Sequence, residues 1–399
     1  MIEKACPMPE PFRAVFGKVL FLTLLFFLTF VGRFIFAPLM PFISRDLGIT
    51  PSQAGSVFLI GSVGYFLAAV CSGYVSSRLK HRGTFILAIF ALGIALLGCA
   101  LVGTFWAIRA TMLILGMAAG LNLPSNVATI TALVSRQDWG KALAVQQMGP
   151  PSSLVLGPLL AVAFLSRFSW EVPLAFLGVC SIAVGIAFIR YGRFGDFPGE
   201  APTPSLLKVV VAHKAFWIMV ILFALAMGGQ VGVYTMLPLY LVGERGMDAQ
   251  SANTLVGVSQ VTGLVMTFLA GWIADRIGEK RAIALFLFTS GIATVFLGVL
   301  SGTLLKVIVF LQPALIVCYF PAGFAALSRI VQPSMRSLAA GWAAPTSFIL
   351  GGGILPTLLG YIGQVLTFGL GIALAGVAII LGSALVPLLT LQEKLEEGC

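Results

Sequence analysis

Residues 19–42 read VLFLTLLFFLTFVGRFIFAPLMPF, an apolar run in which Arg33 is the one charged side chain. An α-helix needs about 20 mostly apolar residues to cross the roughly 30 Å hydrocarbon layer of a bilayer. The backbone finds no water in that layer, so it must satisfy its own hydrogen bonds within a helix. The run therefore predicts a membrane-spanning helix.

Similar apolar blocks recur along the whole chain of 399 residues. Hydrophobic residues make up 59% and charged residues 10%, against about 25% charged residues in a soluble domain. The blocks lack the alternating pattern of membrane β-strands. We expect an all-α membrane protein with twelve transmembrane helices, at about residues 17–42, 53–75, 84–104, 108–133, 141–165, 173–190, 216–241, 251–273, 282–302, 304–328, 337–364 and 367–390.

Composition also excludes several classes of function. The net charge of +10 comes from basic residues scattered over short loops, which argues against a nucleic-acid partner. The two histidines, His81 and His213, lie in expected loops, and the six cysteines show no metal-ligand spacing. No glycine-rich phosphate loop is present. We therefore expect neither an enzyme nor a metal or cofactor.

The distribution of Lys and Arg predicts the orientation. The two termini and the loops on their side of the membrane carry 18 of these residues, and the opposite loops carry five. Because basic residues are retained on the cytoplasmic side, both termini are expected in the cytoplasm, in a multi-pass protein of the cytoplasmic (inner) membrane. The five exceptions are Arg45, Arg109, Arg167, Arg245 and Lys306.

The two halves of the chain have the pattern of repeats. Gly48 and Gly73 flank the second span, and an offset of 198 residues carries them onto Gly246 and Gly271 around the eighth. Two parallel six-helix repeats with a solute site between them are a common plan of secondary transporters. The expected parts are an N-terminal bundle at 1–190, a cytoplasmic linker at 191–215 that acts as a tether, and a C-terminal bundle at 216–399.

The loop after the eighth expected span reads GWIADRIGEKR over residues 271–281. It resembles the loop signature of the major facilitator superfamily, in which glycine, three residues and Asp-Arg are followed by a further glycine and basic residues. The equivalent loop at 73–82 reads GYVSSRLKHR, where Ser77 replaces the family's acid and Lys80 replaces its glycine. With the span count, the linker and the repeats, the resemblance covers the whole chain and implies a transporter.

The physical interpretation of this signature is a gate. Asp275 can accept hydrogen bonds from helix N-terminal amides, and Arg276 can pair across the two bundles. Such contacts stabilise the state closed to the cytoplasm and must break in each transport cycle. The alternative is that the basic residues only anchor the loop at the membrane surface. The candidate gating residues are Gly271, Asp275, Arg276, Gly278 and Arg281, with Gly73 and Arg78 in the first copy.

Arg33 is the residue that narrows the substrate. It lies roughly 16 residues into its helix, near the bilayer centre, where insertion of an arginine costs about 2.5–3.5 kcal/mol. All 14 Asp and Glu residues fall in expected loops or termini, so no membrane carboxylate can balance this charge. We infer that the missing anion is the substrate, because the guanidinium binds carboxylates in bidentate fashion. The alternative is a structural arginine that bonds to backbone carbonyls, glutamines and water.

Arg33, followed by the run Asp46-Leu47-Gly48, resembles the anion:cation symporter branch of the superfamily, in which an arginine of the first helix contacts organic anions. This resemblance implies an organic anion site. The chain departs from the branch after Arg33, where Phe34 and Ile35 follow, and in the fourth span, which lacks the acid tied to proton coupling. A proton or another ion coupled to transport is therefore kept as an alternative partner.

The repeat suggests further residues for the site. Gln230 lies eight residues before Pro238, as Arg33 lies eight before Pro41, so the two should occupy equivalent places. Other polar side chains in the expected spans either line the cavity or join helices to one another. These substrate-site candidates are Asn122, Asn126, Gln146, Gln147, Tyr234, Gln260 and Tyr319.

The sequence thus predicts a monomeric transporter in the lipid bilayer that moves a small organic anion, a carboxylate, by alternating access. Three alternatives remain. An efflux transporter for drugs or amphipaths fits the many aromatics, although a membrane acid would be expected. An inorganic anion carrier would favour an arginine in each half, where the second half has Gln230. The altered loop at 73–82 also permits a transport-inactive scaffold.

Overall fold

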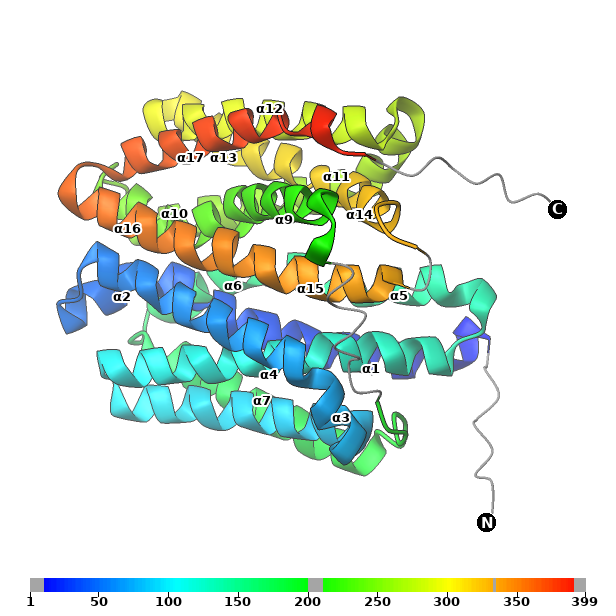
Figure 1. The fold of residues 1–399 in the computed structure, drawn as a ribbon. Coiled ribbons are helices and arrows are strands. Elements are labelled where there is room, and N and C mark those ends of the chain that lie inside the picture. Colours follow the sequence, from blue (N-terminus) through cyan, green and yellow to red (C-terminus); the bar gives the residue numbers. More distant parts are fainter. Residues whose placement is uncertain (1–10, 200–210, 333–334, 391–399) are drawn as a thin grey trace, which may run out of the picture.

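The computed structural model describes residues 11–199, 211–332 and 335–390. These residues form helices that run back and forth between two ends of the molecule (Figure 1). We call the end where α1 begins the terminal end, and the opposite end, with Gly48 and Gly246 in its loops, the far end. The first half contains α1 (Phe12–Phe34), α2 (Phe36–Leu47), α3 (Pro51–Val102), α4 (Phe105–Leu133), the 3₁₀-helix η1 (Arg136–Asp138), α5 (Trp139–Gln147), α6 (Gly149–Leu165) and α7 (Glu171–Tyr191).

The second half repeats this plan with more interruptions. Its elements η2 and η4 are π-helices. The half contains α9 (Lys214–Met227), η2 (Gly228–Gly232), α10 (Val233–Gly243), α11 (Ala249–Ile277), α12 (Glu279–Val299), α13 (Gly302–Ile316), α14 (Tyr319–Ser328), α15 (Arg336–Phe348), η4 (Ile349–Ile354), α16 (Leu355–Val365), α17 (Phe368–Ser383) and η5 (Val386–Leu388).

Local sequence explains where the first elements start and stop. Pro38 has no N–H for the carbonyl four residues earlier, and the helix is interrupted at Ile35. Gly48 ends α2 with a φ of 63°, in the left-handed region that favours glycine. Thr50 then starts α3 through a capping box, because its side chain accepts from the Gln53 N–H while the Gln53 side chain accepts from the Thr50 N–H.

The span count confirms the predicted all-α membrane fold. Ten helical stretches among the described residues are long and apolar enough to cross a membrane, or up to eleven with the bent pair within 249–277. One of these stretches is α3, whose 52 residues hold both the second and the third expected span. The chain leaves helical geometry at Lys80 and folds back there, so α3 crosses twice (Figure 1). Counting the bent pair as one span and α3 as two spans gives the expected twelve spans.

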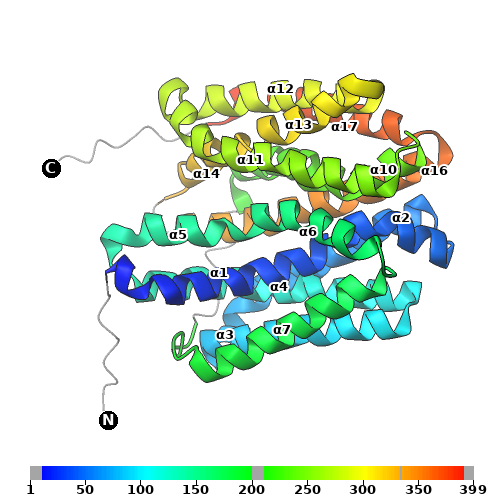
Figure 2. The same ribbon diagram turned by 180° about the vertical axis from the view of Figure 1, so that it is seen from behind.

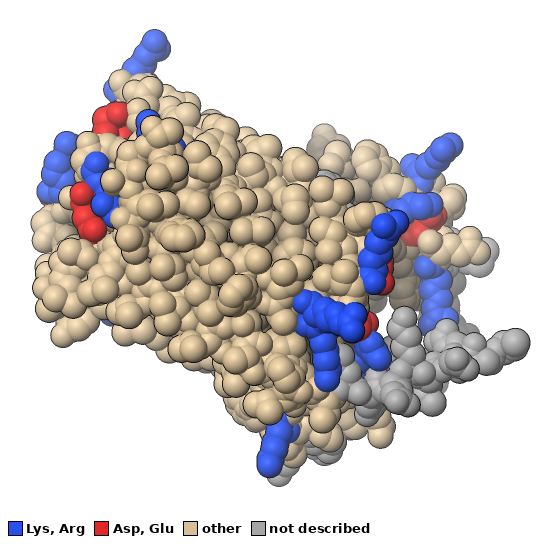
Figure 3. Space-filling view, turned by 90° about the horizontal axis from the view of Figure 1, so that it is seen from above, with Lys and Arg blue, Asp and Glu red and all other residues tan. Residues whose placement is uncertain are grey.

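The charged side chains gather at the two ends of the molecule. Figure 3 shows Lys, Arg, Asp and Glu near both ends and an uncharged band between them. Large apolar side chains such as Ile94, Val179 and Leu381 are more than half exposed on the helices. An exposed apolar band of this kind is the surface that a lipid bilayer covers.

Among the described residues, the buried apolar clusters show that the two halves share a core at one end. One cluster lies wholly within the second half, from Phe216 to Leu389. The other contains the first half together with second-half residues such as Tyr240, Val256 and Phe368. Most of these second-half residues flank the far-end loops. The halves are therefore packed together at the far end, as the neighbouring positions of α2 and α10 also show in Figure 2.

Two glycines permit the closest approach at this closed far end. A Cβ atom added to Gly55 of α3 would lie 2.3 Å from the Pro356 carbonyl oxygen, and one added to Gly360 of α16 would lie 2.1 Å from the Pro51 oxygen. The Asn253 side chain also donates a 3.1 Å hydrogen bond to the Pro38 carbonyl across the two halves. Backbone contact of this kind holds the far end shut.

Candidate functional site

Arg33 lies in the last turn of α1, where residues of both halves surround its side chain. Its side chain is only 2% exposed. Its Cδ lies beside Gly61 of α3, where a Cβ atom added to the glycine would be 3.8 Å away, an ordinary van der Waals distance. The arginine therefore points into the protein, as expected for a charge in a membrane span.

Four aromatic rings surround the Arg33 guanidinium. Its Cζ lies 5.5 Å from the ring centroid of Phe30, 5.0 Å from Phe34, 5.4 Å from Tyr65 and 4.4 Å from Phe348. Aromatic faces attract cations by about 0.5–2 kcal/mol each, with the larger value where the pair is desolvated. We call these four residues the aromatic box. It orients the guanidinium but offers its terminal nitrogens no hydrogen-bond acceptor apart from the Tyr65 hydroxyl.

The terminal nitrogens of Arg33 have no protein partner in the described ranges. Nη1 and Nη2 are both buried, and neither forms a hydrogen bond or an ion pair with a described residue. A buried charge that lacks a counter-charge is costly. Five N–H groups that remain charged and planar are a ready site for a bidentate anion.

The box joins the two halves near the middle of the molecule. Phe34 packs edge-on against Tyr234 of α10, with ring centroids 6.1 Å apart. The buried Tyr234 hydroxyl donates a 3.1 Å hydrogen bond to the Leu154 carbonyl of α6. Tyr234 is thus brought close to the arginine's aromatic surroundings, although its own hydroxyl bonds to the backbone of the other half.

The two asparagines of α4 lie against α1 rather than against Arg33. The Asn126 amide donates to the Leu22 carbonyl at 2.9 Å and to the Asn122 side-chain oxygen at 3.2 Å. The Asn122 Nδ2 and the Asn126 Oδ1 are buried and have no hydrogen-bond partner among the described residues. These residues join helices, and they keep capacity for a further polar partner.

The remaining candidates are scattered over the fold. Gln146 is buried with both side-chain polar atoms unpaired among the described residues, whereas Gln147 is exposed. Gln260 is 8% exposed, and Gln230 is partly buried within the π-helix η2. Tyr319 is buried against Phe223, in the cluster confined to the second half. Among the described residues, no hydrogen bond or ring contact joins Arg33 to these five residues.

The aromatic box is not apparent from the sequence. Aromatic residues make up 11% of the chain, so no single ring stands out in the sequence. Phe30 and Phe34 lie one helical turn before Arg33 and directly after it, and spacing alone could have suggested them. Tyr65 and Phe348 reach Arg33 only because α3 packs against α1 and α15 packs against α3, and the sequence does not display this packing.

Among the described residues, no hydrogen bond or ion pair joins the loop with the intact signature to the first half. Asp275 forms no hydrogen bond or ion pair with any described residue, and Arg276 stacks over the Trp272 ring at 4.0 Å. Gly278 has a φ of 85°, which explains glycine at this position. Gly271 has open space around it, and Arg281 is exposed. The proposed latch is therefore not engaged here.

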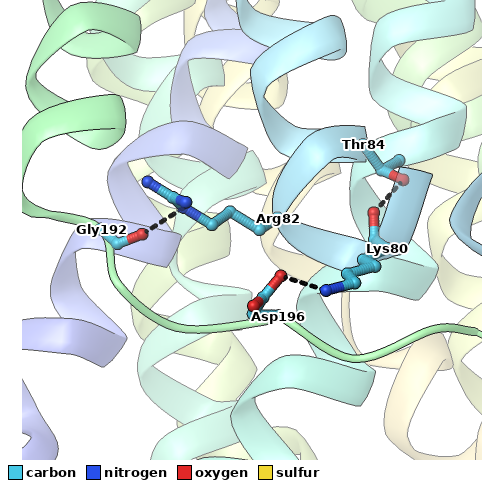
Figure 4. Close-up of polar contacts among 5 residues, drawn as sticks. All are labelled: Lys80, Arg82, Thr84, Gly192 and Asp196. Carbon is cyan, nitrogen blue, oxygen red and sulfur yellow. Dashed lines mark hydrogen bonds and ion pairs between the residues drawn. The ribbon is translucent and has the colours of Figure 1, made fainter.

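The first copy of the signature, at 73–82, holds the linker instead. Residues 192–199, which we call the linker strap, run along this loop (Figure 4). Backbone hydrogen bonds join the His81 N–H to the Phe197 carbonyl at 3.2 Å and the Gly199 N–H to the Ser76 carbonyl at 3.1 Å. The Lys80 ammonium also pairs with the Asp196 carboxylate at 2.9 Å. Gly73 is partly buried and Arg78 is exposed.

Arg82 fastens the other end of the strap. Its side chain donates to the Gly192 carbonyl at 2.9 Å (Figure 4). It also donates to the Ile189 carbonyl at 2.9 Å, at the C-terminal end of α7. Its backbone N–H donates to the Gly195 carbonyl at 2.8 Å. A cation at a helix C-terminus satisfies carbonyls that have no helical partner. The strap thus ties α7 to the turn between the second and third spans.

Lys80 adopts the geometry that its glycine counterpart adopts in the other half. Its φ of 59° and ψ of 167° match the 85° and 151° of Gly278, which lies 198 residues later. Residues other than glycine are held in this region at a cost of about 1–3 kcal/mol. We expect Lys80→Gly to unfold at a higher temperature than Lys80→Ala, because both lose the ion pair and only the glycine relieves the strain. Thermal unfolding of the two purified variants measures the difference, and equal melting temperatures would contradict the assignment of strain.

An apolar groove elsewhere lacks the chemistry of an anion site. It has a volume of about 820 Å³ and lies between α1 and α5–α6, where Leu20, Phe27, Met148 and Leu156 line it. It contains no charged side chain and does not include Arg33. We therefore place the candidate site at the arginine.

A known protein family matches most of this chain. The model of the Major Facilitator Superfamily matches residues 22–318, which is well over half of the chain. The chain therefore belongs to the Major Facilitator Superfamily, and it is a membrane transporter rather than an enzyme, as the sequence predicted.

The individual proteins that are similar to this chain are only distantly related to it in sequence. The gallate transporter of Pseudomonas putida is 26% identical over 84% of this chain and 82% of its own length. The niacin transporter NiaP of Acinetobacter baylyi is 21% identical, with 78% and 79% covered. Multidrug resistance protein 2 of Bacillus subtilis is 23% identical, with 81% and 82% covered. The names of these relatives therefore include both organic acid and multidrug transporters.

A solved structure supports the fold. A bacterial homologue of the human lysosomal transporter Spinster, in an inward-facing and occupied conformation, superposes with a TM-score of 0.80 at 14% identity. The match covers 95% of this chain and 97% of the other. At this level of identity the likeness concerns the fold, including the arrangement of helices that the model shows.

Proposed function

We propose that this transporter moves a small organic anion across the cytoplasmic membrane by alternating access, and that Arg33 binds the substrate carboxylate. The observation that carries the proposal is the buried guanidinium whose Nη atoms have no partner among the described residues. A carboxylate would neutralise the charge and accept two charge-assisted hydrogen bonds at once. The site candidates Gln230, Asn122, Asn126 and Tyr234 are proposed to complete the cavity in other states of the cycle.

The aromatic box favours an anion that carries a ring. Phe30, Phe34 and Tyr65 surround the arginine from the first half, and aromatic pairs gain about 0.5–1.5 kcal/mol beyond the area they bury. A flat carboxylate can place its charge on Arg33 and its ring among these side chains. The similarity to a gallate transporter and a niacin transporter supports this choice.

The test is uptake by the purified protein in liposomes. We expect accumulation of a labelled aromatic carboxylate such as benzoate, competition by other carboxylates and no competition by cationic amphipaths. Competition by amphipathic drugs would favour the efflux alternative, to which the multidrug relative points. Transport of nitrate without benzoate would favour an inorganic anion carrier, and no transport of any solute would favour a scaffold.

The orientation is proposed from the charge bias of 18 to five. It makes the closed far end the outer side and the terminal end the cytoplasmic side. A reporter fused after Cys399 is expected to be active as a cytoplasmic marker and inactive as a periplasmic one. Alkaline phosphatase and fluorescent-protein fusions measure the two outcomes, and a periplasmic signal would reverse the assignment.

The loop at 271–281 is proposed to close the cytoplasmic side in another state of the cycle. Asp275 is unpaired among the described residues while the far end is shut, as a latch should be in the opposite state. We expect Asp275→Asn to keep substrate affinity and to slow transport several-fold, because it removes a contact that only one state makes. Binding and uptake measured on one preparation separate the two effects, and transport at the wild-type rate would show that this latch does not limit the cycle.

A further inference from the structure

Phe348 is the one member of the aromatic box that comes from the second half. Its ring centroid lies 4.4 Å from the Arg33 Cζ, closer than the other three rings. It also contacts Tyr65 of α3, with ring centroids 5.3 Å apart. The positive charge of the first half is therefore held against a ring of the second half.

The chain directly after Phe348 leaves regular helical geometry. Phe348 ends α15, and the next six residues form the π-helix η4. Such segments are rare compared with α-helices and are frequently found at functional sites. The other π-helix, η2 in the seventh span, packs against η4, since a Cβ atom at Gly232 would lie 2.4 Å from the Gly351 oxygen.

Three consecutive glycines of η4 pack closely against three different neighbouring residues. A Cβ atom at Gly351 would lie 2.2 Å from the Ala224 oxygen of α9, and one at Gly353 would lie 2.9 Å from the Ser62 Cβ of α3. A Cβ atom at Gly352 would lie 2.8 Å from the Phe348 ring itself. The segment that follows Phe348 thus lies against the backbone of α9 in its own half and against the Ser62 side chain of the first half, so a movement of the Phe348 ring would alter contacts with both halves.

We propose that Phe348 is a positioning residue through which the second half senses whether the charge of Arg33 is neutralised. The proposal rests on the function proposed above, because the substrate carboxylate is what neutralises the charge. A carboxylate bound in the plane of the guanidinium leaves the stacked face in place and removes most of the electrostatic attraction. Substrate binding therefore loosens a contact between the halves, and the two must rock apart for transport.

This arrangement has a thermodynamic consequence. If binding of the anion weakens the Arg33–Phe348 contact, loss of the contact must strengthen anion binding by the same factor. A cation–π contact of about 0.5–2 kcal/mol corresponds to roughly a two- to 30-fold change. Phe348→Leu, which keeps an apolar side chain and removes the ring, should bind benzoate more tightly by a factor in this range. It should also transport more slowly, because binding no longer changes the contact.

Hydrogen exchange at the closed far end tests the coupling. In the wild type, benzoate should raise amide exchange in the segments 51–62 and 349–360, which hold the halves together. Phe348→Leu without benzoate should already show the raised exchange, and benzoate should add little. Phe66→Leu is the matched control, because Phe66 of α3 packs against Trp342 of α15 with ring centroids 6.1 Å apart, a contact between the same two helices that lies outside the aromatic box, and the variant should keep the full response. A full benzoate response in Phe348→Leu would overturn the proposal.

A double-mutant cycle measured without any ligand separates this inference from the identity of the substrate. Arg33→Gln removes the charge in place of the anion, so it should raise far-end exchange in the wild-type background and change nothing further in Phe348→Leu. If this coupling is found and no carboxylate binds the wild type, the proposed function fails and the role of Phe348 stands. Additive effects of Arg33→Gln and Phe348→Leu would refute the role of Phe348 even if benzoate is transported.

Discussion

Arg33→Gln is expected to fold and to lose carboxylate binding by roughly ten- to 150-fold, which corresponds to a lost charge-assisted interaction of about 1.5–3 kcal/mol. The variant should fold because it removes a buried charge whose Nη atoms have no partner among the described residues. It also places in the first half the residue that the second half has as Gln230. Size-exclusion chromatography establishes folding, and a thermal-shift titration with benzoate measures affinity through stabilisation by mass action.

Arg33→Lys is the matched variant. Lysine keeps the charge and loses the planar fork, so partial binding should remain. If Arg33 has only a structural role, the pattern should differ: Arg33→Gln should aggregate, and any surviving protein should stay fully active. A monodisperse Arg33→Gln protein that transports benzoate with normal affinity would remove Arg33 from the site and remove the anion from the proposed function.

Gly360→Ala is expected to reduce transport by roughly five- to 150-fold while the benzoate site stays intact. The added Cβ would lie 2.1 Å from the Pro51 carbonyl oxygen of the other half, and backbone atoms cannot yield as a flexible side chain can. Overpacking of this kind costs about 1–3 kcal/mol, and the cost falls only on the state whose far end is shut. The closed state should be depopulated and the cycle slowed.

Two further variants define the cause. Gly55→Ala places its Cβ 2.3 Å from the Pro356 oxygen in the same interface and should act like Gly360→Ala. Gly98→Ala is the control, because this helical glycine has nothing within 4 Å of the added atom. Uptake in liposomes and the far-end hydrogen exchange should change together in the first two variants only. Normal uptake by Gly360→Ala would show that this contact is not required in the cycle.

The far-end contacts and the free Asp275 describe one state of a cycle that needs two. The halves share a core at the far end, where Asn253 bonds to the Pro38 carbonyl. At the terminal end, the ion pairs of the described residues, such as Lys80 with Asp196 of the linker strap and Arg329 with Glu279, do not join one half to the other. Interaction energy is thus concentrated at one end, and the opposite state must build comparable contacts at the other.

Much of the fold could be predicted from the sequence, for a simple physical reason. The length and apolarity of a span are imposed by the bilayer, and each residue reports them locally. The twelve spans, the repeat and the family signature at 271–281 follow from such local information. The position of Arg33 in the first span, with no acid in any expected span, likewise predicts a buried charge before any packing is known.

The site needed more than local information. Asn122, Gln146 and Tyr319 are polar residues of membrane spans, and their sequence does not distinguish a residue that joins helices from one that lines a cavity. The structure places Tyr319 against Phe223 and gives Arg33 a box of rings instead. Those rings are common residues in a chain of this composition, so their identity carries no signal until helices pack.

The sequence by itself determined that this chain spans a membrane twelve times, belongs with a transporter family and buries a cation in its first span. These properties follow from the cost of placing polar groups in hydrocarbon, which each stretch of chain meets alone. Only the tertiary structure decided which end is shut, that Lys80 takes a glycine's backbone geometry, and that Phe348 of the second half covers Arg33 of the first. Each of these depends on contacts between residues far apart in the chain, and such contacts are fixed by the packing of whole helices.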